Sequence, residues 1–255
     1  IELDGDLNNT GGGGVEFRNG GQLRVAGDID SNGDVRQSGT GVVAFIGDRS
    51  IVTSGKLVEI VGPVELRSGL TGGAPELSIS TTGGKILFWS SIDSLTPGSL
   101  TLDAGGSGDV ELRGAIGGTN VLREVVVVNA NDLLVANTLR TGRFEQQSGT
   151  GTTSLLGVIE SLGAGGIEVL TAGDLIVNRL RANGDVPLSL TAGDDISIGA
   201  NGEVFVTGNA NSTTLVIDAG GDLLIDPTAR LRVGTGVNQA VSSGVRPVIT
   251  VTPGA

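Results

Sequence analysis

The sequence contains no cysteine, histidine, methionine or tyrosine, and these absences remove several classes of chemistry. Without cysteine the chain forms no disulfide and no thiolate metal site. Without histidine it lacks His-dependent catalytic triads, the common zinc sites and the usual general base near neutral pH. The reactive groups that remain are Ser, Thr, Lys and carboxylates, and we therefore expect the chain not to be an enzyme.

Aromatic residues and long hydrophobic runs are also scarce. The 255 residues include one Trp and five Phe, so the apolar content is mostly Val, Leu and Ile. No run approaches the ~20 apolar residues that cross a bilayer, so we expect no membrane insertion. No window shows the i, i+3, i+4, i+7 spacing of a helix, and the apolar residues alternate with period 2, which indicates strands.

Positive charge is limited. The chain has 28 acidic and 16 basic residues, giving a formal charge of −12, and two of the basic residues are lysine (Lys56 and Lys85). Nucleic-acid binding needs a basic footprint, so we expect no nucleic-acid partner. The same sign disfavours attraction to anionic membranes. The acidity fits solubility, repulsion between chains or loose binding of divalent cations.

What the chain does contain is a repeat. Two apolar residues two apart are followed by a short Gly/Ala/Asp corner and then by another such pair. The six copies are Leu77/Ile79 with Ile86/Phe88, Leu100/Leu102 with Val110/Leu112, Val125/Val127 with Leu133/Val135, Ile167/Val169 with Leu175/Val177, Leu188/Leu190 with Ile196/Ile198, and Leu215/Ile217 with Leu223/Ile225. The starts at 77, 100, 125, 167, 188 and 215 are 23, 25, 42, 21 and 27 residues apart. Such a period predicts a β-solenoid.

The repeat also predicts the details of the solenoid. A third apolar position per turn (Ile92, Ile116, Leu139, Leu180 and Leu231) indicates three parallel strands per turn. We expect an all-β parallel β-helix of about 21–27 residues per turn and roughly 11–12 turns. It forms one domain over 1–233, with regular turns over 76–233 and less regular ones over 1–75. The inward positions expected in 1–75 are Val15/Phe17, Leu23/Val25, Val43/Phe45, Leu57 and Val64/Leu66.

A longer period is superimposed on this one. The run Gln37–Gly41 has the same sequence, Gln-Ser-Gly-Thr-Gly, as Gln147–Gly151, so the two runs are offset by 110 in residue number (37 to 147). This offset equals five turns of about 22 residues each and predicts that a block of turns was duplicated. A degenerate copy of the repeat, from Phe144 to Leu162, occupies the gap between the third and fourth clear copies.

The tail over 234–255 differs from the rest. A Gly-rich run precedes a β-prone segment, Val248, Ile249, Thr250, Val251 and Thr252, which lies between Pro247 and Pro253. Proline cannot donate to a ladder and so fits the boundaries of an edge strand. A solenoid must shield its terminal turns. We therefore expect this strand either to cap the last turn or to link subunits by strand addition or head-to-tail stacking.

Acidic residues recur at the corners and are the candidate metal ligands. Five of them, Asp109, Asp132, Asp174, Asp194 and Asp222, stand at comparable points of their turns. Stacked ~4.8 Å apart, they would repel one another unless cations screened them. Asp also simply favours tight corners, where it bonds the corner amides. We expect no obligatory cofactor; the calcium hypothesis predicts a melting temperature that rises with millimolar calcium.

A polysaccharide-active site is the main enzymatic alternative. Asp28 and Asp30 are two apart and would share one face of a strand, and Asp195 lies at a corner. Carboxylates ~5 Å apart serve retaining glycosidases, and carboxylates ~6.5–9.5 Å apart serve inverting ones. Sugar sites usually also carry aromatic platforms. Phe88 continues the inward pattern, so Trp89 is the one aromatic residue expected to face outward.

Three runs resemble the repeats of very large bacterial surface proteins. They are Gly108–Thr119, Phe144–Leu155 and Leu188–Ile196. The chain is similar, over about residues 35–235, to adhesin-like proteins of the filamentous-haemagglutinin and autotransporter-passenger type, which are common in planctomycetes and other Gram-negative bacteria. The resemblance implies a right-handed parallel β-helix, secretion to the cell surface and a structural or adhesive role.

Repeat and resemblance together define the expected function. We expect a secreted, non-enzymatic structural protein that forms or decorates an extracellular fibre, sheath or adhesive surface. Its expected partners are further copies of itself or other surface proteins and glycans. An adhesin module that binds glycan or protein is the first alternative, and a polysaccharide-active enzyme is the second.

Overall fold

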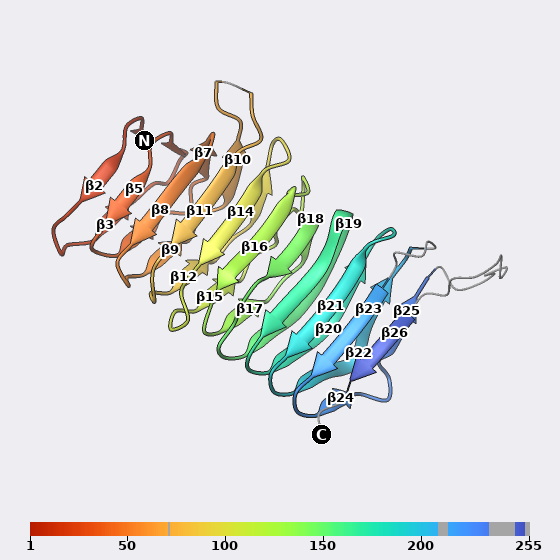
Figure 1. Cartoon of the computed structure of the whole chain (residues 1–255). Helices are drawn as coiled ribbons and strands as arrows, with labels where there is room; N and C mark the ends of the chain where they lie inside the picture. The colour runs from red at the N-terminus through yellow and green to blue at the C-terminus, as the bar shows by residue number, and fades with distance from the viewer. Residues whose placement is uncertain (71, 209–213, 235–247, 253–255) are drawn as a thin grey trace.

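The structure is a computed structural model, and we describe residues 1–70, 72–208, 214–234 and 248–252, with the backbone alone for 248–252 (Figure 1). The described residues form strands and corners without a helix, and none of them therefore provides a helix that could cross a membrane. The strands pair in parallel and stack as a β-solenoid of about ten turns. The predicted fold class is confirmed.

Each turn contributes strands to three faces, which we call A, B and C. Face A holds β2 (Leu7–Asn9), β5 (Ile29–Ser31), β8 (Arg49–Thr53), β11 (Glu76–Ser80), β14 (Ser99–Asp103), β16 (Glu124–Asn129), β21 (Pro187–Ala192), β23 (Thr214–Ala219) and β26 (Val248–Thr252). Face B holds β3 (Val15–Phe17), β6 (Val35–Gln37), β9 (Val58–Ile60), β12 (Ile86–Phe88), β15 (Val110–Leu112), β17 (Leu133–Val135) and β24 (Leu223–Ile225). Face C holds β1 (Glu2–Leu3), β4 (Leu23–Val25), β7 (Val43–Ile46), β10 (Val64–Arg67), β13 (Ile92–Ser94) and β25 (Arg230–Val233).

Four longer strands serve more than one face. β20 (Leu175–Ala182) and β22 (Ile196–Val206) run from face B into face C, and β18 (Leu139–Gln146) runs from face C into face A. β19 (Thr153–Thr171) passes through all three. Register shifts mark where these strands bend, for example between Val177 and Arg179. The turn predicted to be degenerate, Phe144 to Leu162, lies in this corner-poor part of the solenoid.

The register along face A gives the length of each turn. Leu7 pairs with Ile29 and Ile29 with Ile51, so the residue number advances by 22 in each of these turns (7 to 29 to 51). It advances by 28 in the next turn, from 51 to 79, and by 19 in the turn from 125 to 144. In the last turn it advances by 34, from 215 to 249.

These turn lengths correct two predictions. The predicted turn length of about 21–27 residues was too narrow a range, and the predicted count of roughly 11–12 turns was too high. The physical reason is that corners absorb insertions without disturbing the strands, so the length of a turn varies while its ladder stays in register.

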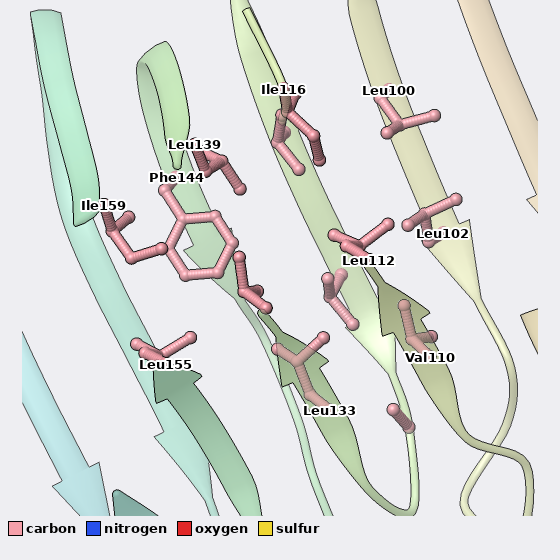
Figure 2. Close-up of a cluster of buried hydrophobic side chains, with 14 of the residues drawn as sticks. Leu100, Leu102, Val110, Leu112, Ile116, Leu133, Leu139, Phe144, Leu155 and Ile159 are labelled. Carbon is pink, nitrogen blue, oxygen red and sulfur yellow. The ribbon is translucent and has the colours of Figure 1, made fainter. Parts of the chain in front are cut away.

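The core is one continuous stack of the predicted apolar pairs. Both residues of almost every pair over 77–217 are buried, and so are the third positions Ile92, Ile116, Leu139 and Leu180. Figure 2 shows Leu100, Leu102, Val110 and Leu112 beside their equivalents in later turns, among them Leu133 and Phe144. Burial of each such side chain stabilises the fold by about 1.5–3 kcal/mol, so the stack is the main source of stability.

Two predicted core positions are wrong. Leu57 lies one residue before its strand and is only half-buried, whereas Val58 and Ile60 are the buried pair of that turn. Ile225 is 40% exposed because β24 is the last face-B strand among the described residues and nothing there covers it. The sequence pattern correctly indicated strands in both places. It did not show that Leu57 lies just outside its strand or that Ile225 lies at the end of the stack.

The two Gln-Ser-Gly-Thr-Gly runs occupy different corners. Gln37 is the buried last residue of β6 on face B, and its run leads to face C. Gln147 follows β18 and its run leads from face A to Thr153 on face B. Because one run follows face B and the other follows face A, the offset between them is not a whole number of turns. The predicted block duplication is therefore not reproduced in the register.

Corner glycines permit the close stacking of turns. At Gly220 a Cβ atom would lie 2.1 Å from the carbonyl oxygen of Gly193 in the preceding turn, and at Gly193 a Cβ would lie 2.3 Å from that of Ala172. Separations under 3.0 Å are not tolerated by real side chains. The glycine at this corner is thus required by the ~4.8 Å spacing of parallel strands.

Candidate functional site

The candidate metal ligands lie in one row along the corner between faces A and B. The residues immediately before the face-B strands, from the first turn to the last, are Gly14, Asp34, Leu57, Lys85, Asp109, Asp132, Thr152, Asp174, Asp195 and Asp222. Six of the ten are aspartate. We call these six, together with Asp194, the aspartate corner.

The aspartates of this corner act as backbone acceptors from one turn to the next. Asp132 Oδ1 accepts the amide N–H of Thr152 at 2.8 Å, and Asp195 Oδ1 accepts that of Asp222 at 2.7 Å. Asp174 Oδ1 accepts the amide of Asp195 at 3.2 Å in the same way. Each carboxylate thus accepts a hydrogen bond from the amide just before a face-B strand. A hydrogen bond to a charged acceptor is comparatively strong.

One predicted ligand is wrong by one position in the sequence. Asp195, not Asp194, continues the register of Asp174, because Ile196 pairs with Leu175. Both corners begin Thr-Ala-Gly-Asp, from Thr171 and from Thr191, but the second has one extra residue before its strand. Aligning the corners by the first apolar residue of the next strand, and not by their Gly, would have identified Asp195.

The geometry of the aspartate corner does not assemble a metal centre. Within the part of the chain that the structure describes, no three carboxylates gather as a group that could hold a metal ion. Asp109 Oδ1 is bonded to Asn131 Nδ2 at 3.1 Å and to the amide of Asp132 at 3.3 Å. The rise in melting temperature that the calcium hypothesis requires stays a prediction to be measured.

Two of the candidate carboxylates for sugar chemistry, Asp28 and Asp195, lie in different parts of the rod. Asp28 Oδ1 accepts the amide of Ser50 at 2.8 Å and faces Arg49 Nη1 at 3.8 Å, at the edge of face A. Asp30 is exposed on face A, and Asp195 belongs to the corner before face B. Asp28 and Asp195 are therefore used as amide acceptors in separate parts of the rod, and the structure does not bring them together.

The lone tryptophan lies where the sequence predicted, on the outside of face B. Trp89 is 46% exposed, while its neighbour Phe88 is buried. The indole Nε1 donates to Glu59 Oε1 at 2.9 Å, and the Arg113 guanidinium lies 4.6 Å from the ring centroid. A cation–π contact at such a site is worth about 0.5–1 kcal/mol. Sequence reasoning identified the exposed indole but had no signal for its partners, because they come from the turns on either side.

Ion pairs lie on the same outer surface of face B as Trp89. The hydrogen bond from Arg18, followed by that from Ser38, lowers the pKa of Glu16 to about 2. Burial raises the pKa of Glu111, but hydrogen bonds from Lys85 and Arg113 outweigh it, so that this pKa lies below its ordinary value. Both carboxylates are held in the ionised form. Neither is suited to accept a proton as a general base near neutral pH.

A hollow on the surface lies where face C leads into face A. It measures about 570 Å³ and is open, and its lining includes Leu122, Arg123, Gly142, Arg143 and Leu162. Its carboxylate, Glu124, is bonded through Oε1 to Ser99 and Arg123, each at 3.2 Å. The hollow thus lacks an unpaired acid or base that could carry a reaction.

The predicted assembly strand extends the ladder of face A. In β26 the backbone of Val248, Ile249, Thr250, Val251 and Thr252 pairs in parallel with Thr214 to Asp218 of β23. Among the described residues no strand pairs with the other edge of β26. The strand occupies the position expected of a cap, and its outer edge is the one that strand addition would use.

The fold defines the class of protein: a three-faced, parallel β-solenoid whose surface polar groups bond from turn to turn. Comparison with protein-family models, with curated protein sequences and with solved structures finds no match to this chain.

Proposed function

We propose that this chain is a non-enzymatic structural module, a stiff rod that forms or decorates an extracellular fibre, sheath or adhesive surface. The observation that carries the proposal is the aspartate corner. Five of its seven acids, Asp34, Asp109, Asp132, Asp174 and Asp195, accept an amide of the next turn, so the most regular polar feature of the surface serves to hold turns together. About ten turns at ~4.8 Å make a rod about 50 Å long.

An extracellular location is part of the same proposal. The lack of cysteine suits a chain threaded through a secretion pore, and the repeats resemble those of bacterial surface proteins. Labelling intact source cells with an antibody against the chain, before and after external protease, tests the location. Surface signal that protease removes is expected; signal that appears only after lysis would contradict it.

Assembly through the ends of the rod is tested by electron microscopy over a range of concentrations. Rods longer than the ~50 Å of one chain are expected, because no described strand pairs with the outer edge of β26. A variant truncated before Val248 serves as comparison and should give shorter rods at unchanged circular dichroism. Discrete single rods at every concentration would contradict assembly by this route.

The enzymatic alternative has a direct test. Release of reducing ends from a panel of polysaccharides should not exceed that of a blank. Release that is lost on Asp28→Asn or Asp195→Asn would overturn the proposal, since these two carboxylates are the acids first considered for sugar chemistry.

A second candidate function, adhesion to a glycan, is supported by Trp89. The indole is 46% exposed beside Glu59 and Arg113, which offers an apolar ring edge together with hydrogen-bonding groups. A glycan array measures binding. Trp89→Ala should abolish it, while Leu156→Ala, which removes an equally exposed side chain from the same face, should not. No binding by the parent chain would remove this candidate.

A further inference from the structure

A cluster of arginines on face C stands out in an acidic chain. Arg179 and Arg181 in β20, Glu203 and Phe205 in β22, and Arg230 and Arg232 in β25 lie on three successive turns, which we call the arginine pad. The register pairs Arg179 with Glu203 and Glu203 with Arg230, and likewise Arg181 with Phe205 and Phe205 with Arg232. Four arginines against one glutamate give the pad a net charge of +3, in a chain of −12.

Most of this charge is not neutralised by the residues that the structure describes. Glu203 Oε2 lies 2.9 Å from Arg181 Nη2 and 3.8 Å from Arg179 Nε. Its pKa lies below the ordinary value, chiefly because of the hydrogen bond from Arg181. Arg230 and Arg232 are exposed and form no ion pair with a described residue. The Nε atom of Arg179 is buried without a hydrogen-bond partner among the described residues.

The complementary surface lies on the opposite side of the same rod. Because three faces enclose one core, the corner between faces A and B points away from face C. On the turns that carry the pad, this corner presents Asp174, Asp194, Asp195 and Asp222. The carboxylates of Asp194 and Asp222 accept no hydrogen bond from a described residue. A carboxylate bonded through Oδ1 also keeps acceptor capacity at Oδ2.

We propose that parallel rods pack side by side, with the arginine pad of one rod receiving the aspartate corner of the next. The occupant is a second copy of this chain, because its acids repeat at the same ~4.8 Å pitch as the arginines, both being set by strand spacing. A sideways translation then brings every turn opposite its equivalent. This contact joins two different surfaces and does not close, so it generates an open row of rods. The inference deepens the proposed function, on which it rests.

The net charge of −12 does not prevent this contact at physiological ionic strength. The Debye length there is about 8 Å, so repulsion between whole rods is screened. Pairs that meet across an interface at hydrogen-bond distance are screened much less. We therefore expect association at an ionic strength of about 0.15 M and loss of association at about 1 M.

Charge reversal tests the contact. Sedimentation velocity of the full chain should show rows of rods, and the double variant Arg230→Glu, Arg232→Glu should weaken association at least about tenfold. The double variant Asp194→Arg, Asp222→Arg should do the same. Mixing the two variants in equal amounts should restore association, because the unchanged arginine pad of the second variant then meets the unchanged aspartate corner of the first.

Matched controls carry the same change of charge elsewhere. Arg18→Glu with Arg36→Glu, on face B, and Asp30→Arg with Asp218→Arg, on face A, should leave association unchanged. Circular dichroism establishes that each variant is folded. Association that the pad variant leaves intact, or a mixture that stays dissociated, would overturn the inference.

Two further readouts separate the possibilities. Electron micrographs with long single rods and no side-by-side rows would overturn the lateral contact and leave the structural function standing; an absence of rods would contradict the function itself. The second readout is binding to dextran sulfate beads. A parent chain that sediments as single rods yet binds the beads through Arg230 and Arg232 would make the pad a polyanion site and overturn the contact between copies.

Discussion

At the scale of single residues, the corner aspartates act as hydrogen-bond acceptors in place of backbone carbonyls. In a parallel ladder each amide needs an acceptor on the neighbouring strand, and at the residue before a face-B strand the Asp side chain of the preceding turn supplies it. The position accepts an occasional Leu, Lys or Thr, so the row is a preference and not a requirement of every turn.

The first prediction concerns Asp132. Asp132→Ala removes the acceptor of the Thr152 amide and should lower the free energy of unfolding by about 1 kcal/mol. Asp132→Asn keeps an oxygen in place and should lie close to the parent. Urea unfolding measures both. Asp30→Ala, at an exposed carboxylate, is the control, and an equal effect at Asp30 would show that charge and not the bond is responsible.

The second prediction concerns pH and Glu203. Its folded pKa lies below the ordinary value of 4.5, chiefly through the hydrogen bond from Arg181. A depressed pKa contributes stability above the unfolded value, and the contribution is lost as pH falls through the folded value. Glu203→Gln should therefore be less stable than the parent at pH 7, and the difference should vanish well below pH 4.5. Thermal unfolding across pH measures the difference; a constant gap would contradict the assignment.

At the scale of strands, a polar pair interrupts the apolar stack. Gln146 stands between Val127 and Val169 on face A, and Thr153 stands on face B. Both are fully buried, and Gln146 Nε2 donates to Thr153 Oγ1 at 2.8 Å while Thr153 Oγ1 donates to Gln146 Oε1 at 3.0 Å. The pair satisfies itself across the core at the point where the sequence repeat degenerates.

The third prediction is a double-mutant cycle on this pair. Thr153→Val or Gln146→Val leaves one buried polar group unpaired and should cost about 1–3 kcal/mol. The double variant leaves none and continues the aliphatic columns, so it should recover most of the loss. Chemical denaturation of the four proteins gives the coupling free energy. Additive effects would show that the two side chains do not depend on each other.

The strands also show what the sequence was able to predict. Period-2 pairs identified the buried residues of nearly every turn, because burial on one face of a strand leaves a direct pattern. The pattern could not reveal Gln146 and Thr153 as core residues, since each looks polar until it meets its partner. Nor could it identify Asp195, whose register depends on one inserted corner residue, or the arginine pad, whose members are spread along the chain from 179 to 232.

At the scale of the whole molecule, contacts are made between neighbouring turns. Every strand pairing joins strands of adjacent turns, so stability is built up along the axis. The fourth prediction follows for hydrogen exchange. Amides in the middle turns, such as those of β14 to β17, should exchange slowest, and those of β1 to β3 fastest, because end turns open first. Mass spectrometry of exchange measures the gradient; uniform protection would show one all-or-none unit.

Turn-by-turn pairing also determines how the rod responds to tension. A pull on one end of the chain loads the turns in succession, because the strand pairings join each turn to its immediate neighbours. The hydrogen bond from Thr150 Oγ1 to the Gly106 carbonyl, at 2.7 Å, reaches two turns away. Releasing a turn of about 22 residues adds about 75 Å of extended chain. A tethered rod would thus lengthen in successive steps, dissipating energy at each one while the remaining turns stay intact. The same stacking that makes the molecule stiff thus lets it absorb mechanical energy one turn at a time.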